Sequence, residues 1–80
     1  MTECLLTELT AGQSARVRRI EGAPAVRLRL QEMGLVRGTL LQFVRVAPLG
    51  DPIEIRVRGY SLSLRRQEAD AVIVERQEQA

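Results

Sequence analysis

The segment from residue 53 to residue 64 constrains the fold more than any other part of the chain, because polar and apolar side chains alternate along it on both sides of one glycine. Such alternation is the pattern of a β-strand with one buried face and one solvated face. Gly59 separates the two alternating halves, IEIRVR and YSLSL, and supplies the tight turn of a β-hairpin. The side chains expected to face the core are Ile53, Ile55, Val57, Tyr60, Leu62 and Leu64.

Three other segments also have strand patterns. Residues 15–21 alternate with one phase slip, which indicates a strand with a bulge or a bend. Residues 39–46 are an apolar run typical of a mostly buried strand, with Phe43 facing inward, and residues 72–74 close the sheet. Residues 5–9 are interpreted as an apolar lead-in that covers one end of the core. Five short strands joined by tight turns predict an all-β fold, a small five-stranded β-barrel, because closure removes exposed sheet edges.

A helix is expected from about residue 24 to residue 33, inserted between the first two strands. Pro24 suits the first turn of a helix, and Gly34 suits the left-handed position that follows the last turn. The apolar stripe that should face the core consists of Val26, Leu30 and Met33. Leu28 lies about 180° from the centre of that stripe and should be exposed. A short helical turn is expected at about residues 66–71.

One domain, spanning residues 1–80, is expected from the length and composition. A chain of 80 residues supplies a single core, and 45% apolar with 28% charged residues is ordinary globular usage. No apolar run approaches the roughly 20 residues that a membrane helix needs, and acids stand where a signal peptide carries basic residues. The single cysteine, Cys4, cannot form an internal disulfide. We therefore expect a cytoplasmic protein without direct membrane insertion.

All twelve basic residues are arginine, and the chain contains neither lysine nor histidine. A P-loop NTPase needs a lysine for the phosphates, and a Ser-His-Asp hydrolase needs an imidazole as base. A structural zinc site needs about four Cys or His ligands, and the acidic residues have no spacing typical of a hard-cation site. The sequence therefore predicts no catalytic, cofactor or metal site, and a protein that acts by binding a partner rather than as an enzyme.

Nucleic-acid binding is an alternative, because small barrels often bind strands and the sequence pI is about 9.5. Single-strand binding by such barrels uses aromatic side chains that stack on bases, and only Phe43 and Tyr60 are available, both expected to face inward. The arginines are also interleaved with acids, so no continuous phosphate-binding stripe is evident. Nucleic acid is therefore not the expected partner.

Two stretches carry a family resemblance: residues 46–71, VAPLGDPIEIRVRGYSLSLRRQEADA, and residues 29–39, RLQEMGLVRGT. Together they resemble the FeoA family, the small cytosolic component of bacterial ferrous iron transport. The most specific element is APLGDPI followed by a strand, a glycine turn and LSLRR. Met33 stands where leucine is commoner in the family.

The resemblance implies an SH3-like β-barrel with an inserted helix, which agrees with the barrel predicted from the strand pattern. It also implies a partner, the ferrous iron permease FeoB, whose cytosolic portion carries a GTP-binding domain. The implied role is accessory: the protein would dock on that permease at the inner face of the membrane and support or regulate iron uptake. The sequence leaves self-association into a homo-oligomer open.

The nearest rival within the fold is a free-standing SH3-like regulatory domain, of the kind found at the C-terminus of iron-dependent repressors. Such repressors also carry a helical DNA-binding portion with metal ligands, and this chain has no corresponding segment. A free-standing module is therefore favoured.

Two surface patches are predicted to bind the partner, because a small barrel offers little concave surface and should use exposed apolar residues ringed by polar ones. The helix patch presents exposed Leu28 and its neighbours, anchored from below by Leu30. The loop patch presents Leu49 at the tip of the Pro48–Pro52 loop, although that loop could instead only fix the register of the barrel. The predicted residues are Arg27, Leu28, Leu30 and Gln31 in the helix patch, and Pro48, Leu49 and Asp51 in the loop patch.

Overall fold

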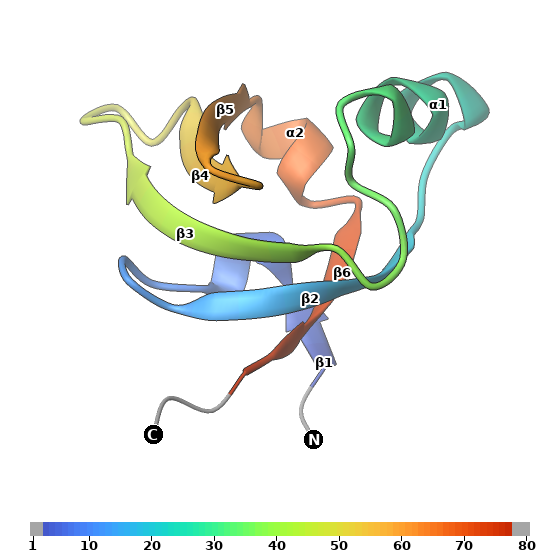
Figure 1. The fold of residues 1–80 in the computed structure, drawn as a ribbon. Helices are drawn as coiled ribbons and strands as arrows, with labels where there is room; N and C mark the ends of the chain where they lie inside the picture. The colour runs from blue at the N-terminus through green and yellow to red at the C-terminus, as the bar shows by residue number, and fades with distance from the viewer. Residues whose placement is uncertain (1–2, 78–80) are drawn as a thin grey trace.

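The computed structural model describes residues 3–77 as a strongly bent β-sheet with one prominent helix at its side (Figure 1). Its elements in chain order are β1 (Glu3–Leu5), the 3₁₀ helix η1 (Leu6–Glu8), β2 (Ser14–Ile20), α1 (Pro24–Glu32), β3 (Leu40–Val46), β4 (Ile53–Val57), β5 (Tyr60–Leu64), α2 (Arg66–Ala69) and β6 (Val72–Arg76).

All neighbouring strands in the sheet are antiparallel, in the order β1-β6-β2-β3-β4-β5. The pairing of β2 with β6 shifts register between Val17 and Arg19, which confirms the irregularity predicted from the phase slip in residues 15–21. In Figure 1 the bend places β4 and β5 above β2 and β3, and α1 projects beside them. The predicted hairpin of residues 53–64 is β4 with β5.

The sheet has six strands where the sequence pattern predicted five. The additional strand is β1, which pairs Glu3 with Glu75 and Leu5 with Ile73 of β6. Three residues with one charged side chain give no alternation, so the pattern indicated only an apolar lead-in there. The lead-in interpretation holds for Leu6 and Leu9, which follow β1 and are buried in the core.

The core fills the inside of the bend and includes the inward residues of β4, with Phe43 of β3 buried as predicted. The predicted inward position of Tyr60 is wrong, because its side chain is 53% exposed. It opens β5, which is an edge of the sheet, so Val57 of β4 flanks it on one side while the other side is open to solvent. Further along β5, Leu62 is half-buried and Leu64 is buried.

Helix α1 turns its predicted apolar stripe toward the core. Leu30 is fully buried, and Val26 and Met33 are partly buried against the core cluster. Pro24 is the first helical residue, and the helix ends at Glu32 with Met33 as its C-cap, one residue before the predicted end. The helix is therefore fastened to the domain by one face only.

The C-terminal end of α1 is closed by a Schellman motif. The N–H of Gly34 donates to the carbonyl oxygen of Gln31, and the N–H of Leu35 donates to that of Leu30, each at 3.0 Å. Gly34 has φ 97°, as predicted for a left-handed cap. The hydroxyl of Thr39 donates to the carbonyl oxygen of Gly34 at 3.1 Å, which ties the cap to the segment entering β3.

Replacing Gly34 with alanine should lower the free energy of unfolding by about 1 to 2 kcal/mol, because an L side chain is disfavoured in the left-handed region. A Cβ at this position would meet no atom within 4 Å, so backbone conformation is the whole effect. Urea denaturation measures it, with exposed Glu32→Ala as a control that should change stability by less than about 0.5 kcal/mol. Equal stability of Gly34→Ala and the wild type would contradict the cap.

Candidate partner-binding surface

The helix patch presents Leu28 to solvent, with 58% of its surface exposed. Arg27 and Gln31 are exposed beside it. Leu30 is fully buried, so it anchors the helix and offers no surface to a partner. Of the predicted residues in this patch, the structure therefore leaves Arg27, Leu28 and Gln31 available for contact.

The loop patch presents Leu49, whose side chain is 97% exposed. A turn holds it there: the N–H of Gly50 donates to the carbonyl oxygen of Ala47 at 2.7 Å, and the N–H of Ala47 donates to that of Pro52 at 3.0 Å. Pro48 is exposed and lines a hollow of about 360 Å³ formed with β3 and β4. The predicted exposure of Leu49 at the tip of the loop is confirmed.

Asp51 has a partner inside the chain. Its Oδ1 accepts the N–H of Arg66, the first residue of α2, at 3.0 Å. The guanidinium of Arg66 in turn donates to the carbonyl oxygen of Gly50 at 3.2 Å. The loop is thus bonded to α2, so Asp51 has a structural role within the chain.

Helix α2 stands between the two patches in Figure 1. On one side it holds the loop through Arg66, and on the other Glu68 makes an ion pair with Arg29 of α1. Glu68 also accepts the N–H of Arg65 at 3.0 Å, which caps α2 itself. The short helical turn predicted at residues 66–71 is α2, which has four helical residues and connects the two surfaces.

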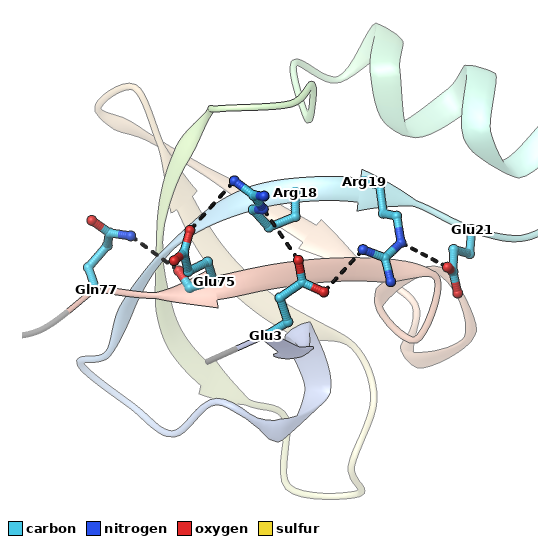
Figure 2. Close-up of polar contacts among 6 residues, drawn as sticks. All are labelled: Glu3, Arg18, Arg19, Glu21, Glu75 and Gln77. Atoms are coloured by element: carbon cyan, nitrogen blue, oxygen red, sulfur yellow. Dashed lines mark hydrogen bonds and ion pairs between the residues drawn. The ribbon is translucent and has the colours of Figure 1, made fainter. Parts of the chain in front are cut away.

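A network of charged side chains covers β1, β2 and β6 (Figure 2). Arg19 contacts Glu3 at 3.1 Å and Glu21 at 2.9 Å. Arg18 contacts Glu3 at 3.4 Å and Glu75 at 3.7 Å. Hydrogen bonding from Arg19 holds the pKa of the Glu3 carboxyl below its usual value. Sequence reasoning missed this network because β1, which supplies Glu3, was not predicted.

Residues 3–77 contain no group of three or more Cys, His, Asp or Glu side chains placed to hold a metal ion. Burial raises the pKa of the Cys4 thiol, which disfavours the thiolate that acts as nucleophile or ligand. Over the same residues, no helix is both long and apolar enough to span a bilayer.

The comparison with known families decides the relationship. The FeoA domain model matches residues 4–76. The chain belongs to the FeoA family. The resemblance drawn from the two sequence motifs is thereby confirmed.

A curated relative links this FeoA-family chain to transport. It is the Fe(2+) transport protein A/Fe(2+) transporter FeoB fusion protein of Porphyromonas gingivalis, 43% identical over 70 residues. The match covers 88% of this chain and 8% of the relative, so the chain spans less than a tenth of that relative's length. The association of the family with ferrous iron transport is confirmed.

Solved FeoA structures share the fold. The NMR structure of a FeoA-like protein from Clostridium acetobutylicum superposes with a TM-score of 0.89 at 41% identity, covering 100% of this chain and 94% of that one. The zinc-complexed FeoA of Stenotrophomonas maltophilia, described as an SH3 domain protein, gives 0.80 at 31% identity, covering 96% of this chain and 99% of that one. The predicted SH3-like fold with an inserted helix is confirmed.

A manganese-dependent transcriptional repressor also contains this fold. The TM-score is 0.88 at 18% identity, and the match covers 96% of this chain and 38% of the repressor. At that identity the likeness concerns the fold alone. Burial excludes Leu30 from direct contact, and the contact roles of the other predicted residues and the docking itself remain predictions.

Proposed function

We propose that this FeoA-family chain is a cytosolic accessory protein of ferrous iron uptake, which docks on a FeoB-type permease at the inner face of the membrane and supports or regulates transport. The observation that carries the proposal is the fusion relative, where a segment similar to this chain is covalently joined to FeoB. Two domains that work together are commonly fused, because a tether replaces a bimolecular encounter with an intramolecular one.

The surface of the FeoA fold supports action by binding rather than by chemistry. Leu28 and Leu49 are large apolar side chains exposed on rigid supports, one on a capped helix and one on a hydrogen-bonded turn. Apolar residues already fixed in place lose little entropy on docking. In the proposal the chain itself catalyses no reaction, and its effect on transport comes through contact with the permease.

Two other functions are distinguished by what they predict. A regulatory domain related to iron-dependent repressors shares the fold, yet this likeness lies at 18% identity and supports no shared function. A nucleic-acid-binding barrel would need stacking aromatic side chains, and Phe43 is buried in the core while Tyr60 stands alone at the sheet edge. Neither observation favours a function other than docking.

Pull-down of FeoB from the same organism tests the proposal directly. The full chain, immobilised, should retain the cytosolic portion of FeoB or full-length FeoB in detergent, each tried with and without guanine nucleotide. An SH3-fold region of a metal-dependent repressor is the matched control, because it shares the architecture and lies outside the family. Failure to retain either form of FeoB under every nucleotide condition would overturn the docking function.

A further inference from the structure

A groove runs between α1 and β2, and its walls are basic. It has a volume of about 290 Å³ and is lined by four arginines, Arg18, Arg19, Arg27 and Arg37. The described residues that line it include no aspartate or glutamate. A hollow with four guanidinium groups and no carboxylate of its own favours an anionic ligand.

The four arginines divide into two pairs. Arg18 and Arg19 are held by Glu3 of β1, Glu75 of β6 and Glu21, which follows β2, as Figure 2 shows. These carboxylates fix the two guanidinium groups and partly offset their charge.

Arg27 and Arg37 form the second pair, and both are exposed. Within residues 3–77 neither makes an ion pair or a side-chain hydrogen bond. Each guanidinium has five N–H donors in a planar fork that matches a carboxylate. The guanidinium groups of Arg27 and Arg37 can therefore bind an anionic group from outside the chain.

Apolar side chains complete the groove. Leu35 and Val17 are buried in its floor, and Val36 lies among the lining residues with 42% of its surface exposed. A suitable ligand would carry an apolar side chain next to an anionic group.

A carboxylate of a protein fits these features better than the phosphates of a nucleic acid. The described lining residues include no aromatic ring that could stack on a base. On the β1 side, the basic surface ends at the carboxylates of Glu3 and Glu75, which would repel a continuing phosphate chain.

We propose that the groove between α1 and β2 binds an acidic segment of a protein partner, with Arg27 and Arg37 pairing with its carboxylates and Val36 contacting an adjacent apolar side chain. The inference rests on the proposed docking function and names the chemistry of that contact. It places Arg27 and Gln31 of the helix patch in the groove and adds Val36 and Arg37, which sequence reasoning did not select.

A peptide titration monitored by NMR tests the groove without the permease. The probe is an end-blocked hexapeptide, Asp-Leu-Glu-Asp-Leu-Glu, and the matched peptide is Asn-Leu-Gln-Asn-Leu-Gln. The acidic peptide should shift the amide resonances of residues 27–31 and 35–37 saturably, and the amide peptide should bind at least about tenfold more weakly. Equal binding of the two peptides, or shifts confined to another surface, would overturn the proposal.

Two double variants distinguish binding in the groove from attraction by the overall charge of the protein. Arg27→Gln with Arg37→Gln should weaken binding of the acidic peptide about tenfold at low salt. Arg56→Gln with Arg58→Gln removes the same charge from β4 and its turn, where both arginines are exposed and unpaired within residues 3–77, and should change binding less than twofold. If both double variants weaken binding of the acidic peptide equally, net charge alone attracts the peptide and the proposal is overturned.

Two further measurements keep this proposal distinct from docking on FeoB. If the acidic peptide occupies the groove and FeoB does not bind the wild-type chain, the groove stands and the docking function fails. If FeoB binds the wild type and the Arg27→Gln/Arg37→Gln variant equally, docking stands and the groove fails. Tighter binding of a single-stranded oligonucleotide than of the acidic peptide, with a steep salt dependence, would replace the protein partner with a nucleic acid.

Discussion

Replacing Leu30 with alanine is expected to lower the free energy of unfolding by about 2 to 5 kcal/mol. Its side chain is fully buried, and its carbonyl oxygen accepts the N–H of Leu35 in the cap of α1. Truncation would leave a cavity beneath the only face by which α1 is attached to the core, and the neighbouring Leu35 is held by the same cap. Urea denaturation followed by circular dichroism measures the loss.

Leu28→Ala is the matched control, because it makes the same substitution on the same helix at a residue that is mostly exposed. It should change the free energy of unfolding by less than about 0.5 kcal/mol. Similar losses for the two variants would contradict the assignment of the inner and outer faces of α1.

Replacing Leu28 or Leu49 with glutamate is expected to weaken association with FeoB by about ten- to thirtyfold while leaving the melting temperature nearly unchanged. An exposed apolar contact of this kind is worth about 2 kcal/mol when it lies at the centre of an interface, and a new carboxylate there would be desolvated without a partner. Titration calorimetry with the cytosolic portion of FeoB gives the affinity, and thermal unfolding checks the fold.

Gln42→Glu is the charge control for these variants, since Gln42 is exposed on β3, outside both patches. It should bind FeoB within about twofold of the wild type. Loss of binding in only one of Leu28→Glu and Leu49→Glu would identify the patch that contacts FeoB. Undiminished binding in both would exclude the helix patch and the loop patch together.

Local patterns were sufficient to predict the hairpin, the position of α1 and the exposure of Leu28 and Leu49. In each case the determining residues lie within a few positions of one another, as with the glycine after α1 and the alternation on either side of Gly59. Strand β1 could not be predicted in this way. It exists because three residues near the start pair with β6 near the end, and a three-residue segment carries no periodic signal.

The basic groove was beyond sequence reasoning for a related reason. Arg27 and Arg37 lie ten positions apart, on a helix and in the loop that follows it, and β2 supplies the other wall. In the sequence the twelve arginines look alike. Only the folded arrangement shows that Glu3, Glu21 and Glu75 pair with Arg18 and Arg19.

The pairing of β1 with β6 brings the first and last described strands side by side, with Glu3 opposite Glu75. In Figure 1 the N-terminal end of β1 and the C-terminal end of β6 lie on the side away from α1 and from the β3–β4 loop. A polypeptide linker attached at either end would thus leave the domain on the side remote from the helix patch and the loop patch. The domain is suited to act on a tether: a short flexible linker would hold it near a target at an effective concentration of about a millimolar, and a contact with a Kd well below that concentration would then be occupied most of the time.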